Sequence, residues 1–226
     1  MVGRAWLLKT ALALGFIYAA PAPADQPCRI AVLGDSLTSS YGLDLPQGFP
    51  ARLEEALRAE GYACEVLDAG VAGDTSAGGV ARLDWMLGDE PSHVIVELGG
   101  NDALRALPPE EMERNLDAIL TRLTAEGIPV LLAGMLAPPN LGPDYGAEFA
   151  AVFPRVAEKH DVPLYPFFLD GVAGDPDLNQ RDGIHPSAAG IERIVDGILP
   201  TVEDWLAAAP TDAAAALLEE PEVVTD

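Results

Sequence analysis

The stretch Ile30-Ala-Val-Leu-Gly-Asp-Ser-Leu-Thr38 decides how the rest of this chain is interpreted. Its first four residues are apolar, and such a short run is typical of a buried strand. The strand breaks at Gly34, so Asp35 and Ser36 fall in the turn that follows. Ligands of open α/β sheets bind at such turns, beyond the carboxyl ends of the strands. Ser36 is therefore a candidate nucleophile, although a serine after a strand also commonly caps the next turn.

Beyond this stretch, short apolar runs alternate with longer segments of helical periodicity. Such alternation implies right-handed crossovers and a mostly parallel sheet covered on both faces. We therefore predict one α/β domain, a three-layer α/β/α sandwich around a mostly parallel five-stranded sheet. The expected strands are residues 30–33, 65–69, 93–98, 129–133 and 162–165, and the expected helices are about 50–60, 76–87, 110–123, 144–159 and 186–206.

Two of the expected helices carry apolar residues at helical spacing, which predicts that one face of each is buried. In the helix at 76–87 these residues are Val80, Leu83 and Leu87. The helix that follows Pro108 has the longer stripe, formed by Met112, Leu116, Ile119, Leu120 and Leu123.

The first 24 residues have the features of a cleaved export signal. Arg4 and Lys9 form a basic region before the apolar run from Ala11 to Ala20, and Ala22-Pro-Ala24 supplies the small residues expected before a cut ahead of Asp25. A membrane anchor is the alternative, but the run is well short of the roughly 20 residues that a bilayer span requires. We expect a signal peptide at 1–24, one domain at 25–206 and, because it is alanine-rich and acidic, a disordered tail at 207–226.

The chain is strongly acidic, with a formal net charge of −23 from 13 basic and 36 acidic residues. Removing the leader takes away two basic residues and no acid, so the mature chain is more acidic still. A field of this sign repels nucleic acid and anionic lipid head groups. We expect no nucleic-acid partner and no stable membrane insertion, and we expect a monomer in the periplasm or the medium.

Two cysteines, Cys28 and Cys64, each lie just before an expected strand. If those strands are parallel neighbours, both cysteines are at amino ends and at similar height. Export favours a disulfide, which would close a loop of about 35 residues and contribute about 3–4 kcal/mol. Two reduced, buried cysteines are the alternative.

Polar residues gather in four loops, three of which directly follow an expected strand and so lie along one edge of the sheet. Acyl transfer needs a nucleophile, a base, a group that orients the base, and donors for the oxyanion. In this interpretation Ser36 attacks, His185 accepts its proton, and Asp182 orients the imidazole. The N–H groups of Ser36 and Gly73 and the side-chain amide of Asn101 would bind the oxyanion.

At these residues the chain resembles the SGNH or GDSL hydrolase family. The resemblance implies a flavodoxin-like SGNH hydrolase fold and hydrolysis of esters and thioesters with acyl chains, without a metal or cofactor. Any one matching segment is weak evidence, but all four occur in the family's order. The segments are Gly34-Asp-Ser-Leu37, Gly70-Val-Ala-Gly-Asp-Thr75, Gly99-Gly-Asn-Asp102 and Asp182-Gly-Ile-His-Pro186.

Within that family the chain is most similar to the thioesterase I / lysophospholipase / arylesterase group. This implies a serine esterase acting on small-molecule substrates such as aryl esters, lysophospholipids and acyl thioesters. Thr38, Ala103 and Ala106 depart from the group's usual residues, and the last two bear on acyl chain-length preference. The supporting segments are Gly73-Asp-Thr-Ser76, Gly99-Gly-Asn-Asp-Ala-Leu-Arg105 and Val162-Pro-Leu-Tyr-Pro-Phe-Phe168.

Four apolar residues lie in the loops after the third and fourth expected strands, on the same edge as Ser36. They are candidates for the wall of an acyl groove, and equally they fit ordinary surface positions. They are Leu104, Leu107, Leu141 and Tyr145.

Several acids near the candidate nucleophile have other expected roles. Asp35 is expected to fix its own turn through backbone contacts. Asp74 is expected to cap the helix that follows it. Asp102 is a second candidate for orienting the imidazole, but Asp182 is closer to His185 along the chain.

The two remaining histidines, His93 and His160, are expected at the amino end of the sheet, away from the candidate site. We expect structural or solvent-exposed positions for both. No metal site is expected either, because the acids are scattered and no pair of histidines has ligand spacing.

Two other functions remain compatible with the same four loops. One is a carbohydrate or peptidoglycan O-acetyl esterase, which would need an open polar cleft and a two-carbon acyl group. The other is a binding module that keeps the fold without the chemistry. Retention of every catalytic role argues against the second, because loss of function usually removes the serine or the histidine.

Overall fold

A computed structural model describes residues 27–208 of this chain. The expected leader and all but two residues of the expected tail lie outside the described residues. Residues 207 and 208 of that tail form the last turn of a helix that ends at Ala208.

The sheet has five parallel strands in the order β2-β1-β3-β4-β5. This is the flavodoxin-like order of doubly wound folds. The α/β fold class predicted from the sequence is therefore confirmed. The strands are β1 (Cys28–Leu33), β2 (Cys64–Asp68), β3 (His93–Glu97), β4 (Val130–Ala133) and β5 (Leu164–Tyr165).

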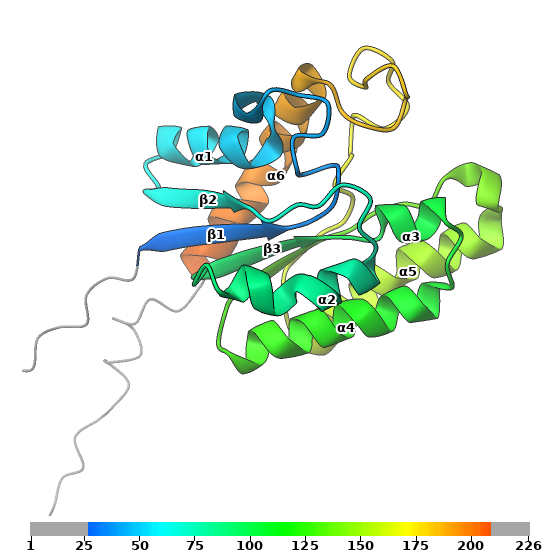
Figure 1. The fold of residues 1–226 in the computed structure, drawn as a ribbon, viewed down its shortest axis with the longest axis horizontal. Helices are drawn as coiled ribbons and strands as arrows, with labels where there is room; N and C mark the ends of the chain where they lie inside the picture. Colours follow the sequence, from blue (N-terminus) through cyan, green and yellow to red (C-terminus); the bar gives the residue numbers. More distant parts are fainter. Residues whose placement is uncertain (1–26, 209–226) are drawn as a thin grey trace, which may run out of the picture.

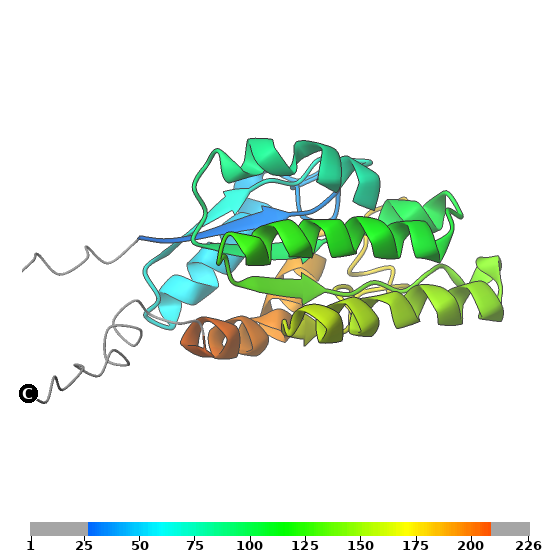
Figure 2. The same ribbon diagram turned by 90° about the horizontal axis from the view of Figure 1, so that it is seen from below.

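Helices cover both faces of this sheet, which gives the three predicted layers (Figures 1 and 2). On one face α1 (Phe49–Ala59) packs against α6 (Ala188–Ala208). On the other, α4 (Pro109–Ala125) packs between α2 (Ser76–Leu87) and α5 (Pro143–His160).

The core lies between the sheet and these helices. The stripe predicted on α4 is buried along its whole length, with all five side chains 0% exposed. The stripe predicted on α2 is partly wrong, because Val80 is exposed and Leu87 is half-buried, whereas Gly79 and Met86, one position earlier in each case, are buried. One residue of shift rotates a helix face by about 100°, so a short stripe defines the buried face less well than a long one.

Two local features differ from the sequence prediction. The segment after β3 was expected as a loop and forms the short helix α3 (Gly100–Leu104). The fifth strand has only two residues, because it begins at Leu164, two positions later than expected. Short 3-10 turns, η1 (Leu45–Gln47) and η2 (Pro139–Leu141), complete the connections.

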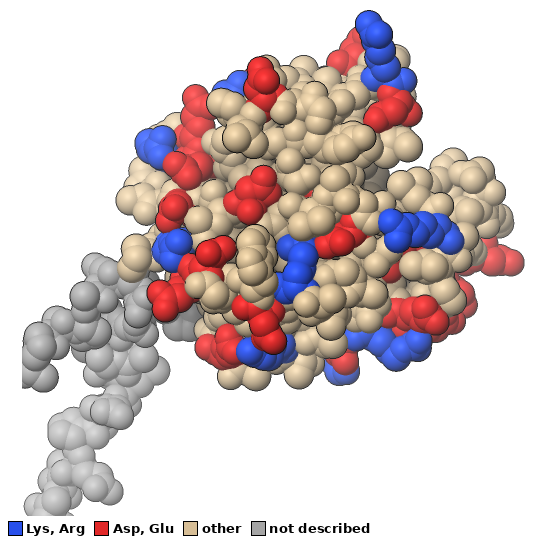
Figure 3. Space-filling view, in the orientation of Figure 1, with Lys and Arg blue, Asp and Glu red and all other residues tan. Residues whose placement is uncertain are grey.

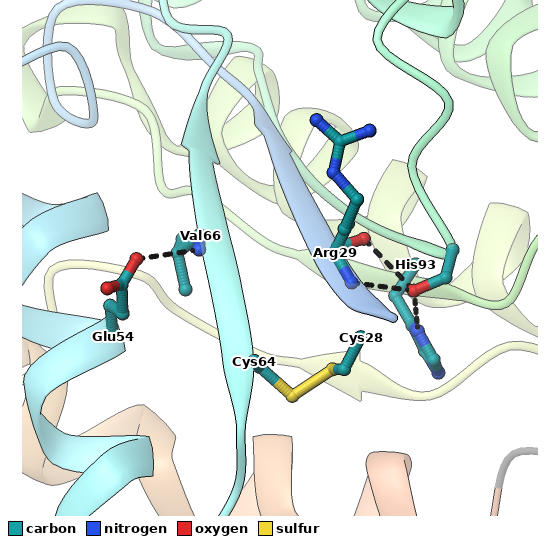
Figure 4. The surroundings of a disulfide bond; sticks show 7 residues. Cys28, Arg29, Glu54, Cys64, Val66 and His93 are labelled. Carbon is teal, nitrogen blue, oxygen red and sulfur yellow. Dashed lines mark hydrogen bonds between the residues drawn. A yellow bond between two sulfur atoms is a disulfide. The ribbon is translucent and has the colours of Figure 1, made fainter. Parts of the chain in front are cut away.

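A disulfide joins Cys28 and Cys64 at the amino ends of the neighbouring strands β1 and β2 (Figure 4). The two residues are direct partners in the parallel register, which brings their Cα atoms to 4.5 Å. Beside it, Glu54 of α1 accepts a 3.0 Å hydrogen bond from the N–H of Val66. At the amino ends of the strands, β2 is thus joined to β1 by the disulfide and to α1 by the hydrogen bond of Glu54.

Candidate active site

The carboxyl ends of the strands face α3 and the long connection into α6 (Figure 1). The turn after β1 is organised by Asp35, which is 1% exposed. Its Oδ1 accepts a 2.9 Å hydrogen bond from the N–H of Leu37, and its carbonyl accepts one of 3.1 Å from the N–H of Ser39. These bonds present Ser36 at the surface of the turn, where it is partly exposed.

His185 and Asp182 lie together on one tight turn before α6. The Oδ1 of Asp182 accepts hydrogen bonds from the N–H groups of Ile184 and His185, at 2.9 and 3.0 Å. Its Oδ2 lies 2.7 Å from Nδ1 of His185. The hydrogen bond with the His185 side chain, supported by those two N–H groups, lowers the pKa of Asp182 to about 2. Asp182 is therefore ionised at neutral pH.

The structure brings this turn against the candidate nucleophile. Nε2 of His185 lies 2.9 Å from Oγ of Ser36, although the two residues are 149 positions apart in the chain. Ser36, His185 and Asp182 therefore form one continuous hydrogen-bonded series. This is the arrangement that nucleophile, base and orienting acid require.

Two backbone donors near Ser36 are free. Among residues 27–208, neither the N–H of Ser36 nor that of Gly73 donates a hydrogen bond. Gly73 has φ +84°, a conformation that residues with a side chain rarely adopt. Its carbonyl accepts a 2.7 Å hydrogen bond from Arg105, just beyond α3. The Gly73 loop is thereby tied to the helix that carries Asn101.

Asn101 lies in the first turn of α3. Its Nδ2 donates a 2.8 Å hydrogen bond to Oδ2 of Asp35, which leaves one amide hydrogen for another acceptor. Burial raises the pKa of Asp35 to about 6, against the opposing effect of its hydrogen bonds with Leu37 and Asn101. Asp35 thus does more than fix its own turn, because it also orients Asn101.

Glu97, the last residue of β3, is a second buried acid close to Asp35. It is 0% exposed, and within the described part of the chain neither carboxyl oxygen has a hydrogen-bond partner. Burial, together with the charge of Asp35, raises the pKa of Glu97 well above its usual range. Burial therefore favours the protonated form of this side chain.

Asp102 does not contact the imidazole. Its carboxylate accepts hydrogen bonds from the backbone N–H and the hydroxyl of Ser76, at 2.8 and 2.6 Å. Asn115 of α4 donates to the same hydroxyl at 3.0 Å. Asp102 therefore joins α3 to the start of α2 and leaves Asp182 as the acid that contacts His185.

The expected role of Asp74 is wrong. The N-cap of α2 is Thr75, whose side chain accepts from the N–H of Gly78. Asp74 instead pairs at 2.6 Å with Arg82, a residue that the sequence analysis did not single out. Arg82 also donates to the carbonyl oxygens of Gly34, at 2.7 Å, and of Ala69.

A cavity of about 100 Å³ opens beside Ser36 and Asn101. Leu104 lines it, whereas the other expected wall residues, Leu107, Leu141 and Tyr145, do not. The hydroxyl of Tyr145 instead donates to the carbonyl of Leu107 at 2.8 Å, which ties α5 to the loop before α4. The apolar lining that sequence reasoning missed consists of Leu37, Met135, Leu136, Pro138, Leu169 and Ile184.

A larger hollow, of about 610 Å³, lies at the opposite end of the molecule. The histidine that lines it, His160, is held by Asp117 at 2.7 Å. The remaining histidine, His93, packs edge-on against Trp205, and burial lowers its pKa. Both histidines thus lie away from Ser36, as expected.

Residues 32–193 match the GDSL-like lipase/acylhydrolase family. This chain belongs to that family. The GDSL hydrolase is 44% identical to the esterase TesA of Pseudomonas aeruginosa over 176 residues, which cover 77% of this chain and 88% of that protein. It is 37% identical to thioesterase 1/protease 1/lysophospholipase L1 of Escherichia coli over 177 residues, covering 78% and 80%. A crystal structure of TesA superposes with a TM-score of 0.75 at 43% identity, covering 78% of this chain and 99% of that one.

These findings confirm the family and the enzyme class predicted from the sequence. The GDSL hydrolase acts on ester bonds of small-molecule substrates. Across residues 27–208, no helix combines the length and the apolar character needed to cross a membrane.

Proposed function

We propose that this hydrolase cleaves carboxylic esters, and acyl thioesters, through an acyl-enzyme formed on Ser36. The observation that carries the proposal is the series Ser36–His185–Asp182, joined by contacts of 2.9 and 2.7 Å. In this mechanism His185 has a proton on Nδ1, directed at Asp182, and a free electron pair on Nε2. Asp182 holds the imidazole in that tautomer.

The reaction proceeds in two halves. Ser36 Oγ attacks the substrate carbonyl carbon while its proton passes to Nε2 of His185. The tetrahedral intermediate collapses, and the departing alcohol or thiol takes that proton, which leaves the acyl group on Ser36. Water then attacks the acyl carbon and gives a proton to His185, and the carboxylic acid leaves as that proton returns to Ser36.

Three donors are proposed to bind the negative oxygen that develops in each half. They are the free N–H groups of Ser36 and Gly73 and the second amide hydrogen of Asn101. Donors already in place before the reaction cost no reorganisation during it, and each is typically worth about 3–4 kcal/mol of barrier.

The lining of the pocket supports an apolar acyl group as the preferred substrate part. Of the side chains around Ser36, six belong to Leu, Met or Ile residues, and Leu104, Leu136 and Ile184 are exposed at the mouth. A cavity of about 100 Å³ encloses only the carbons nearest the scissile bond, so a longer chain would extend across these exposed residues. This apolar lining disfavours the polar cleft of a carbohydrate O-acetyl esterase.

The proposal also includes the localisation, the oligomeric state and the partners of the enzyme. We infer export to the periplasm or the medium from the expected leader and the disulfide, and a monomer as the working state. On the face drawn in Figure 3, acidic and basic side chains are interspersed and the basic ones do not gather into a patch. This distribution supports the absence of a nucleic-acid partner.

The nucleophile and base are tested by Ser36→Ala and His185→Ala. We expect both variants to fold normally and to lose nearly all hydrolysis of a p-nitrophenyl ester, and Ser36→Ala to lose labelling by a fluorophosphonate. Ser92→Ala and His160→Ala are the matched controls, because both positions lie at the opposite edge of the sheet, and both should stay active. Full esterase activity in Ser36→Ala would refute the proposed nucleophile.

The acyl preference is tested with p-nitrophenyl esters of increasing chain length. We expect kcat/KM to rise from acetate to longer acyl groups, because more apolar area contacts the pocket and its mouth. Leu136→Ser should flatten this rise. A preference for acetate that is unchanged by Leu136→Ser would instead favour the O-acetyl esterase.

A further inference from the structure

The aromatic ring of Tyr41 lies against the imidazole of His185. The two ring centroids are 4.4 Å apart and the ring planes are tilted by 35°. The His185 side chain is 16% exposed, whereas Tyr41 is 49% exposed, so the tyrosine covers the histidine from the solvent side. Neither the nucleophilic attack nor the oxyanion donors described above use Tyr41.

Specific contacts hold Tyr41 in this place. Gln180 donates one side-chain hydrogen bond to the carbonyl of Tyr41, at 2.8 Å, and another to that of Pro186, at 2.9 Å. Its backbone N–H donates to the carbonyl of His185 at 2.7 Å. Gly42 has φ +73°, and a Cβ there would lie 2.2 Å from Oε1 of Gln180. Gln180 therefore joins the loop of the nucleophile to the loop of the base.

The proposed reaction turns the imidazole into an imidazolium cation in each transition state. A cation is attracted to the negative face of an aromatic ring when it lies within about 6 Å of the ring centroid. We propose that Tyr41 is a positioning residue, whose ring holds His185 in line with Ser36 and stabilises the imidazolium that forms there. This inference rests on the proposed role of His185 as the base.

Two carboxylates near His185 also stabilise the imidazolium, and each approaches it from a different side than Tyr41 does. Asp182 contacts Nδ1 from the same turn, and Asp35, directly after β1, interacts with the imidazole electrostatically. Tyr41 instead adds the face of an aromatic ring, which is not a carboxylate. Its removal therefore changes the stability of the imidazolium without removing a charge.

The test compares three variants. Tyr41→Phe keeps the ring, and Tyr41→Leu keeps apolar bulk over the imidazole but has no aromatic face. Trp85→Leu is the control, because Trp85 is another exposed aromatic residue, on α2, with 63% of its surface exposed. For each variant, kcat and KM for a p-nitrophenyl ester are measured from pH 5 to 9, with a thermal melt as a check on folding.

We expect Tyr41→Phe and Trp85→Leu to match the wild type. Tyr41→Leu should lower kcat about two- to fivefold with little change in KM, the size of a partly exposed cation–π interaction. Because the imidazolium is less stable in this variant, the acid limb of its pH–activity profile should move about 0.3–0.7 pH units lower. Equal losses in the Phe and Leu variants, or a loss in the Leu variant with an unshifted acid limb, would overturn the inference.

A second measurement does not depend on activity. The chain has three histidines, so the ring signals of His185 can be assigned by NMR with His93→Gln and His160→Gln variants. The titration midpoint of His185 should be lower in Tyr41→Leu than in the wild type and unchanged in Tyr41→Phe. Identical midpoints in all three proteins would refute the inference.

These outcomes are separable from failure of the proposed function. If Ser36→Ala and His185→Ala are inactive while Tyr41→Leu behaves as the wild type, only the role of Tyr41 is wrong. If Ser36→Ala remains active, the proposed mechanism itself is wrong, whatever the Tyr41 variants do.

Discussion

At the scale of single residues, the buried carboxylate of Asp35 serves two neighbours at once. One oxygen accepts the N–H of Leu37 and shapes the turn of the nucleophile, and the other accepts the amide of Asn101. The cost of this arrangement is a charge in the interior, which is reflected in a pKa raised to about 6 by burial. Sites of this kind commonly trade stability for a fixed catalytic geometry.

Asp35→Asn should reveal that trade. Between its usual value and about pH 6, the folded protein keeps a proton on Asp35 that the unfolded chain has lost, so this group's contribution to stability falls as pH rises. Asparagine does not titrate, so the variant does not lose stability from this position as the pH rises. From pH 4 to pH 8 its unfolding free energy should therefore rise relative to the wild type, by up to about 3 kcal/mol.

The kcat of Asp35→Asn should fall at every pH, because Asn101 loses its carboxylate acceptor. Urea unfolding at several pH values measures the stability, and steady-state kinetics measure kcat. A stability difference that does not change with pH would contradict the prediction.

Asn101→Ala tests the oxyanion donor directly. We expect kcat to fall about 10²-fold with KM little changed, because the negative oxygen exists in the transition state and not in the bound ester. Asn115→Ala is the matched control, since within residues 27–208 its side chain donates to Ser76 alone and does not line the pocket beside Ser36. A change in KM alone would place Asn101 in ground-state binding instead.

At the scale of elements, Arg82 joins α2 to the carboxyl ends of two strands. Its guanidinium, which is 14% exposed, contacts Asp74 and the carbonyls that follow β1 and β2. The loops that begin there carry Ser36 and Gly73. Arg82 thus helps to fix the spacing between Ser36 and Gly73, together with the hydrogen bond from the N–H of Val71 to the carbonyl of Gly34.

Arg82→Met should cost about 2–4 kcal/mol of unfolding free energy, because it removes the ion-pair partner of Asp74, the donor to the Ala69 carbonyl and one of the two donors to the Gly34 carbonyl. It should also lower kcat, through looser placement of the two loops. Arg58→Met is the control, since the Arg58–Glu54 pair is exposed and such pairs are worth about 1 kcal/mol or less. Chemical denaturation and kinetics would measure both, and equal effects of the two substitutions would contradict this assignment.

At the scale of the whole molecule, stability and chemistry are placed at opposite ends of the sheet. The disulfide joins the amino ends of β1 and β2, whereas Ser36 and its partners lie at the carboxyl ends (Figures 1 and 4). Parallel strands make this separation possible, because all their carboxyl ends meet at one edge. A substitution at the disulfide end of the sheet is therefore expected to leave the geometry around Ser36 unchanged.

Removing the disulfide with Cys28→Ala and Cys64→Ala together should lower the unfolding free energy by about 3–4 kcal/mol. The kcat at 25 °C should stay the same, because the site at the opposite end is unaffected. Thermal melts with and without dithiothreitol provide the comparison, since reduced wild type should melt near the double variant. A fall in kcat while the protein remains folded would contradict the separation of the two ends.

Much of the fold follows from local patterns in the sequence. Short runs rich in apolar residues marked most of the strands, and the five-residue stripe of α4 marked its buried face, because strand and helix periodicity depend only on near neighbours. The short α3 escaped prediction because Gly99 and Gly100 favour a loop. Asp74 was misassigned because Thr75, an equally good cap, follows it directly.

For the candidate site too, some features follow from the local sequence and others only from the tertiary structure. By itself the sequence determined which residue types were available for acyl transfer and at which strand ends they occur, because chemistry and turn preference belong to single residues and short segments. Only the tertiary structure decided their partners: Asp35 with Asn101, Arg82 with the carbonyl of Gly34 across 48 positions, and Gln180 with that of Tyr41 across 139. No local periodicity encodes such pairs, since they form only after the strands have brought distant loops to one edge.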